Sequence, residues 1–363
     1  MIPRIMKTLS ISTPADSPRR LEVVLAFIIA LSVILTFWSQ QRYPALLKKL
    51  HAGQSVRVAG AISFDALLPV AATMAAPERI ARTSVNWLYT NRFGMYFALP
   101  FGAALMTLLA SVARPKRFAS ASANVFCGAL AGAPMGVCTN CATPVAQSLI
   151  AGGASTRLTL AAMISSPSFN PVVVAMTFVL FPLPLAALRV AVPAILLLAL
   201  PLLVPESMPA ILGLRIPEPV EPLATRLRTF FITYAKNFLR LTWMTLPWML
   251  LAAFLGACAA ELIPAYGTHL PVSAFGVVAV AILGTLLPVP MALDVALSYI
   301  LFHAGVPLPY VAALLCTLGP VSVYSLTAMS RQLGRTTGLR LAGTVAALGT
   351  IAGFVMMLPG MHP

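Results

Sequence analysis

Two cysteines stand three positions apart in an otherwise apolar stretch, where residues 138–144 read CTNCATP. Thiols bind soft metals and metalloids, and paired thiols also exchange with disulfides. A polar, helix-breaking backbone at membrane depth is tolerated only where protein buries it or it lines a watery cavity. We therefore expect Cys138 and Cys141 to bind a substrate or a soft metal, although small buried cysteines can also serve only as packing.

A second polar segment follows, where residues 165–171 read SSPSFNP. A hydroxyl side chain before a proline is a common helix start, because the oxygen caps free N–H groups and proline fits the first helical position. This rule predicts that half-helices begin at Thr143-Pro144 and at Ser166-Pro167. Their N-terminal ends carry unpaired N–H groups and partial positive charge, which favour an anionic ligand.

Uncharged polar side chains accompany both motifs. Amides and hydroxyls donate and accept hydrogen bonds without a charge penalty, which suits a substrate cavity, although they can equally join helices to one another. We expect the substrate-binding residues to be Cys138, Asn140, Cys141, Gln147, Ser166 and Asn170.

Two carboxylates lie in apolar segments: Asp294 within residues 291–302, and Asp65 within residues 58–76. A carboxylate inside a membrane is costly and by default marks function. We expect both to take part in proton coupling. The alternative for Asp294 is a hydrated or capping position at a helix end, near two prolines.

The composition requires a membrane setting. Apolar residues make up 59% of the chain and charged residues 9%, and the mean hydropathy is +0.91. The sequence predicts an all-α, polytopic membrane helix bundle of about eight to ten spans, some of them broken. Residues 172–204 are long enough for one tilted helix or a tight pair. The expected spans are 21–38, 58–76, 93–112, 124–137, 172–204, 241–260, 272–287 and 339–358.

The charge pattern indicates orientation in the membrane. Lys and Arg outnumber Asp and Glu by 24 to 9, and most of the basic excess lies between spans, as the positive-inside rule describes. Nucleic-acid binding is not expected, since no soluble domain could carry a groove-reading element. The partners we expect are the lipid bilayer and a small-molecule or ion substrate.

The chain divides into two halves. A polar segment, residues 1–20, precedes a first transmembrane half, 21–204; a proline-rich linker, 205–228, leads to a second half, 229–363. An offset of 153 residues aligns Ala151-Gly152 with Ala304-Gly305, Pro167 with Pro320, and Cys141 with Asp294. Interrupted segments at corresponding positions predict two pseudo-repeats with a binding site between them.

The cysteine-bearing turn, the Ala-Gly-Gly hinge and the Ser-Ser-Pro-x-x-Asn-Pro motif together resemble the bacterial predicted-permease family that includes the organoarsenical efflux permeases. The resemblance covers residues 93–358 and is specific in 138–171. It implies a multi-pass protein of the bacterial inner membrane, efflux, and cysteines that handle trivalent organoarsenicals. This chain departs from the family in having two residues between the cysteines instead of one, and GPVSV at 319–323 instead of an Asn-containing motif.

These features predict a membrane permease and not an enzyme: a secondary, ion-coupled efflux transporter for a small soft-metal or metalloid, thiol-reactive or anionic substrate. No Walker A pattern occurs, so ATP coupling would need another subunit, and no cofactor is expected. The alternative is a membrane thiol-disulfide oxidoreductase that passes electrons through Cys138 and Cys141.

Overall fold

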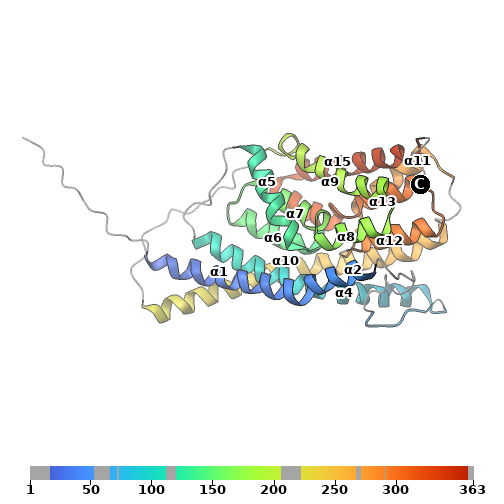
Figure 1. Ribbon diagram of the computed structural model, residues 1–363. Helices are drawn as coiled ribbons and strands as arrows, with labels where there is room; N and C mark the ends of the chain where they lie inside the picture. The colour runs from blue at the N-terminus through green and yellow to red at the C-terminus, as the bar shows by residue number, and fades with distance from the viewer. Residues whose placement is uncertain are drawn as a thin grey trace, which may run out of the picture.

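The computed structural model describes residues 17–52, 66–71, 73–111, 120–205, 222–266, 271–290 and 292–358. Every regular element in these ranges is a helix, which confirms the all-α prediction. Three long helices, α1 (Ser17–Phe37), α4 (Ala76–Ser111) and α10 (Leu223–Tyr266), run along one side of the bundle, with α4 packed against both others (Figure 1). A π-helical turn, η1 (Trp38–Arg42), joins α1 to α2 (Tyr43–Ala52).

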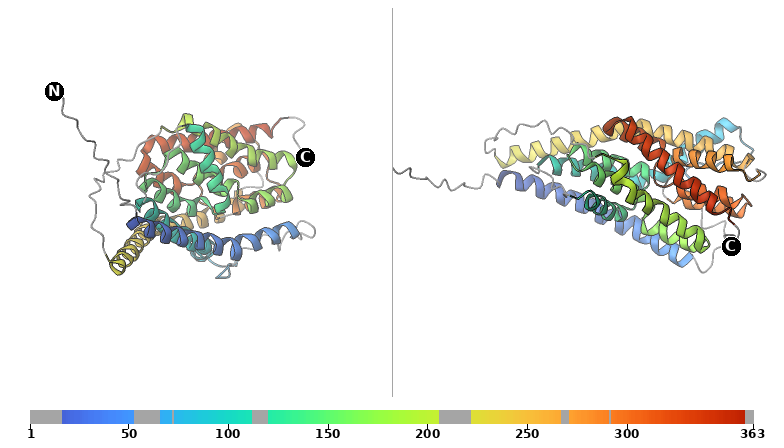
Figure 2. Two further views of the ribbon diagram at one scale, coloured as in Figure 1. Left: turned by 60° about the vertical axis from the view of Figure 1, so that its left-hand side comes forward. Right: turned by 90° about the horizontal axis from the view of Figure 1, so that it is seen from above.

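The other helices form the rest of the bundle, as the view from above shows (Figure 2). Those after α4 are α5 (Ala121–Gly132), the turn η2 (Ala133–Met135), α6 (Thr139–Ala151), α7 (Thr156–Ser168), α8 (Pro171–Leu180) and α9 (Leu183–Leu203). Those after α10 are α11 (Ala274–Leu286), α12 (Leu293–His303), α13 (Leu308–Thr317), α14 (Val323–Leu333) and α15 (Arg335–Val355).

These two series of helices correspond at an offset of 152 residues. Helices α9 and α15 both have 21 residues, and their ends match at this offset. The turns after α6 and α12 contain Gly153 and Gly305, at φ +81° and +82°. The offset expected from sequence was 153, so the structure shifts the alignment by one residue. Asp294 then corresponds to Ala142 and not to Cys141.

Among the described residues, fewer helices can span a membrane than the sequence predicts for the whole chain. Five of these helices have the required length and apolar composition, and α7 with α8 forms a sixth candidate that bends by 42° at its break. The expected spans 124–137 and 272–287 contain helices of only 12 and 13 residues. At 1.5 Å per residue such helices reach about 20 Å, short of the roughly 30 Å hydrocarbon core. The five are Leu21–Leu47, Ala76–Leu109, Leu183–Leu203, Leu223–Cys258 and Arg335–Val355.

Residues 172–204 form a pair of helices, α8 and α9, which is one of the two predicted arrangements. Two other expected segments differ from the prediction. Helix α10 begins at Leu223, so the last six residues of the expected linker are helical. In the expected span 58–76, residues 66–71 and 73–75 are not helical. Asp65 lies outside the described residues, as do residues 1–16 and 206–221.

The half-helices do not begin where the hydroxyl-proline rule placed them. Pro144 lies inside α6, which begins at Thr139 with Cys138 as its N-cap. Pro167 lies inside α7, and the break follows it, where Asn170 caps α8 and Pro171 occupies the first turn. A thiol and an amide oxygen therefore take the capping positions that the rule assigned to hydroxyls.

Small residues bring α4 and α6 close together. A Cβ added at Gly94 would lie 2.6 Å from Cys141 Sγ, and one added at Gly102 would lie 2.9 Å from Ser148 Oγ. Ala98, one turn from each glycine, is fully buried. A small-xxx-small stripe of this kind lets membrane helices approach closely, and here it determines how near α4 lies to the cysteine turn.

Candidate functional site

The two cysteines converge at the start of α6. Cys138 Sγ accepts a hydrogen bond from the backbone N–H of Cys141 at 3.4 Å, and the two Sγ atoms lie 3.1 Å apart. Cys138 also donates to Asn91 Oδ1 on α4, at 3.4 Å. Both cysteines are buried: Cys138 is 4% exposed to solvent and Cys141 is 1% exposed. Two thiols in this arrangement can bind one soft atom together.

Two residues that the sequence analysis missed flank the thiols. Arg42, at the end of η1, lies near both cysteines, with its guanidinium 4.4 Å from the centroid of the Phe37 ring. Tyr324, on α14, belongs to the same buried cluster and stacks on Trp248 of α10. Both are distant from the motif in sequence. The one signal for Arg42 is its position in a polar turn that interrupts the first apolar helix.

The first turn of α6 is bonded to the second half of the chain. Ser322 Oγ donates to Asn140 Oδ1 at 2.8 Å, and the Thr139 hydroxyl donates to the carbonyl of Gly319. Both contacts are buried. The loop that sequence comparison treated as a degenerate motif therefore covers the cysteine turn.

The same loop provides the cap of α14. Ser322 caps this helix and forms a reciprocal capping box with Ser325. Ser322 also corresponds to Asn170 at the offset of 152, so both residues cap the fourth short helix of their series. The second half retains the capping function with a different residue type, which a motif search for asparagine does not detect.

Ser166 supports the cysteine turn from α7. Its hydroxyl bonds both backbone groups of Val137, donating to the carbonyl and accepting from the N–H, each at 3.2 Å. Val137 directly precedes Cys138, so Ser166 fixes the backbone that positions the thiol. The predicted role of Ser166 in substrate binding stays a prediction, to which the structure adds this contact.

The remaining two predicted residues lie apart from the cysteine turn. Gln147 is buried two turns further along α6, and its Oε1 has no hydrogen-bond partner in the described part of the chain. Asn170 caps α8, where its Oδ1 accepts from the N–H of Val172 at 2.9 Å. The structure thus unites Cys138, Asn140 and Cys141 in one turn, places Ser166 beside it, and leaves Gln147 and Asn170 apart from it.

We expect Asn170→Leu to lower the free energy of unfolding by about 1 kcal/mol, since it removes the oxygen that caps α8. Asn170→Ser, which keeps a capping oxygen, should stay closer to the wild type. Thermal unfolding in detergent measures both. An Asn170→Leu protein as stable as wild type would show that the cap contributes nothing.

Asp294 forms a buried ion pair that sequence did not anticipate. Its Oδ2 lies 2.5 Å from Nη2 of Arg189, on α9. Gly319 packs against the pair, because a Cβ added there would lie 2.5 Å from Arg189 Nη2. Asp294 is in the first turn of α12, at a helix end as one alternative expected, and it is buried, with 3% of the residue exposed. The role of Asp294 in proton coupling remains a prediction, and any proton that Asp294 takes up would act on its ion pair with Arg189.

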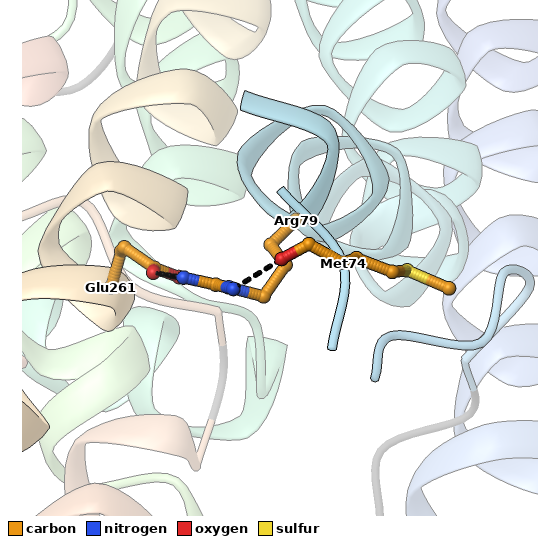
Figure 3. A network of polar contacts seen from close by, with 3 residues as sticks. All are labelled: Met74, Arg79 and Glu261. Atoms are coloured by element: carbon orange, nitrogen blue, oxygen red, sulfur yellow. Dashed lines mark hydrogen bonds and ion pairs between the residues drawn. The ribbon is translucent and has the colours of Figure 1, made fainter. Parts of the chain in front are cut away.

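A second ion pair joins the two longest helices (Figure 3). Arg79 of α4 bonds the carboxylate of Glu261 on α10, with its Nε 3.0 and 3.1 Å from the two oxygens, and also donates to the Met74 carbonyl. The hydrogen bond from Arg79 holds the pKa of the Glu261 carboxyl below its usual value. This contact secures α4, which carries Asn91 and Gly94, against α10.

Metal-ligating side chains are sparse in the ranges that the structure describes. No group of three or more His, Cys, Asp or Glu residues is placed to hold a metal ion there. The pair at Cys138 and Cys141 therefore offers two protein ligands. Such a site leaves the remaining coordination positions of a bound soft atom to groups that the ligand itself brings.

Comparison with known proteins identifies relatives of this chain. Residues 108–358 match a protein-family model described as "Predicted permease". The chain is also 28% identical over 233 residues to the Escherichia coli (strain K12) protein titled UPF0718 protein YraQ. That alignment covers 64% of this chain and 67% of the relative. No solved structure matches the chain.

Proposed function

Because the chain belongs to the predicted-permease family, we propose that this multi-pass membrane protein is a secondary transporter that binds its substrate at Cys138 and Cys141. The substrate class is a small, thiol-reactive metal or metalloid species. The protein would export this substrate across a bacterial inner membrane, and the transport would be coupled to an ion gradient.

One observation carries the proposal: the 3.1 Å separation of two buried Sγ atoms at the start of a 13-residue helix. Half-length helices at an interface between repeats are typical of transporter binding sites. The site here also touches the second half of the chain through Ser322 and Gly319. A movement of the two halves would therefore change the surroundings of the thiols.

The chemistry of binding needs no oxidant or reductant. A trivalent arsenic centre with two hydroxyl groups forms one As–S bond to each cysteine while its two As–O bonds break. The two thiol protons leave with the two hydroxyl groups as two molecules of water. Hydrolysis of the As–S bonds reverses the reaction, so the thiols can release the substrate unchanged on the other side of the membrane.

Everted membrane vesicles test this function. Vesicles that contain the protein should accumulate phenylarsonous acid when a proton gradient is imposed, and vesicles from cells without the protein should not. Equal accumulation in both preparations would contradict the proposed transport.

The short distance between the sulfur atoms also favours a second candidate, thiol-disulfide exchange. A disulfide needs an S–S separation of about 2.05 Å, which a small rotation of the side chains could reach from 3.1 Å. Alkylation mass shift in membranes treated with oxidant or reductant distinguishes the two functions. A pair that cycles between thiol and disulfide during growth supports the oxidoreductase, and a pair that stays reduced supports the transporter.

A further inference from the structure

Hydrogen-bond donors without acceptors surround the cysteine pair. Among the described residues, Arg42 Nε, Tyr324 Oη and Asn140 Nδ2 have no hydrogen-bond partner. All three residues are more than nine-tenths buried. A buried polar group without a partner costs roughly 1–3 kcal/mol, so three in one place call for an explanation.

Arg42 is the most costly of the three. Its guanidinium lies over the Phe37 ring, and no carboxylate pairs with it in the part of the chain that the structure describes. Burying a charge without a counter-charge is strongly unfavourable. The positive charge that Arg42 brings to the site is therefore balanced by no carboxylate of the described residues.

The backbone before Cys138 makes room for this guanidinium. Gly136 adopts φ +62°, a conformation that favours glycine, and a Cβ added there would lie 3.3 Å from Arg42 Cδ. Arg42 itself projects from a π-helical turn, a feature found frequently at functional sites. Two independent local features thus hold Arg42 against the turn that carries the cysteines.

Tyr324 approaches the thiols from α14, whereas Asn140 lies between the two cysteines in the first turn of α6. The hydroxyls of Tyr324 and of Thr245 on α10 lie near each other, but neither oxygen has a hydrogen-bond partner of normal geometry among the described residues. Asn140 uses its oxygen for Ser322, which leaves its N–H₂ group free. Gln147 Oε1 is an acceptor without a partner, but it lies two turns further along α6.

We propose that Arg42, Tyr324 and Asn140 form an anion subsite beside Cys138 and Cys141, so that the substrate is a small anion that carries a soft, thiol-binding atom. This inference rests on the proposed function of the cysteine pair. The thiols bind the soft atom, and the three donors bind oxygen atoms of the negatively charged group. The partial positive charge at the start of α6 adds to the attraction.

Two arsenical probes that differ in one group test the subsite. Phenylarsonous acid is neutral, and 3-carboxyphenylarsonous acid carries a carboxylate on the same ring. Transport of each into everted vesicles gives a ratio of anionic to neutral probe. We expect the wild type to favour the anion. Arg42→Gln should lower this ratio about ten- to one-hundredfold, as expected for a lost charge-assisted hydrogen bond.

Further variants keep the test decisive. Tyr324→Phe preserves the ring on Trp248 and removes the hydroxyl, so it should lower the ratio about three- to tenfold. Arg42→Lys keeps the charge and should retain part of the preference for the anion. Arg92→Gln, at an arginine that lies over the rings of Tyr89 and Phe93, is the matched control and should leave the ratio unchanged. If Arg42→Gln is not recovered from membranes, the transport ratios of Tyr324→Phe and Arg42→Lys test the subsite, and two unchanged ratios would overturn it.

The outcomes separate this inference from the proposed function. If Cys138→Ser transports both probes like the wild type, the function of the cysteine pair is wrong. If Cys138→Ser transports neither probe while Arg42→Gln and Tyr324→Phe leave the ratio unchanged, the anion subsite alone is wrong. A wild type without preference for the anion overturns the subsite as well, as does an equal loss of both probes in Arg42→Gln.

Discussion

Cys138→Ser and Cys141→Ser are each expected to reduce transport of phenylarsonous acid to the background of vesicles without the protein. The exchange of sulfur for oxygen barely changes side-chain volume, but it removes a soft ligand that a hydroxyl cannot replace. Since the two Sγ atoms lie 3.1 Å apart and act on one centre, loss of either should be as severe as loss of both. Vesicle uptake, normalised to the amount of protein, measures the effect.

Matched controls exist in the same chain. Cys127 and Cys258 are free and partly exposed, and neither is part of the turn at the start of α6. Cys127→Ser and Cys258→Ser should transport like the wild type, and all four variants should reach the membrane in similar amounts. Full activity in both Cys138→Ser and Cys141→Ser would show that these cysteines only pack.

Asp294→Asn is expected to destabilise the protein by about 3–5 kcal/mol, because it leaves Arg189 buried without a counter-charge. Thermal unfolding in detergent measures this loss. The double variant Arg189→Met with Asp294→Leu removes both charges together, and such replacements are often neutral or stabilising. We therefore expect it to recover most of the lost stability. An Asp294→Asn protein as stable as the wild type would contradict a structural role for the ion pair of Arg189 and Asp294.

The double variant also tests the expected role of Asp294 in proton coupling. It should be stable enough for transport assays and has no titrating group at this position. If Asp294 carries the coupling proton, uptake by the double variant should no longer depend on the imposed proton gradient. Uptake that still follows the gradient would leave the ion pair as a purely structural element between α9 and α12.

The features of this protein that were predictable from sequence are those that depend on local composition. An apolar chain with interrupted helices requires a helical membrane bundle, and the polar turn around Cys138 stands out within it. The start of α6 was misplaced because a cysteine caps this helix, and capping rules are built on oxygen side chains. The start of α8 was misplaced because the rule considered hydroxyls alone, whereas asparagine caps a helix as well as serine does, and only tertiary packing decides between Ser166-Pro167 and Asn170-Pro171.

Arg189 shows a different reason for failure. The rule that marks a charged residue in an apolar span applies to arginine as well as to aspartate, and Arg189 is the one charged residue in the 21-residue helix α9. It was therefore accessible from sequence. Arg42 and Tyr324 were not, because their approach to the thiols depends on how α1, α6 and α14 pack. In the described part of the chain, two expected spans proved to be short helices, because apolar residues continue through the breaks that separate them from their neighbours.

The bonds between the first turn of α6 and the loop before α14 have a consequence for biosynthesis. Asn140 and Ser322 are 182 residues apart, which at about 5–20 residues per second corresponds to roughly ten to forty seconds of translation. During that interval the cysteine turn exists without its cover from the second half. The thiols thus acquire their final surroundings only near the end of synthesis, and a premature stop codon before residue 322 would leave them exposed in an incomplete protein.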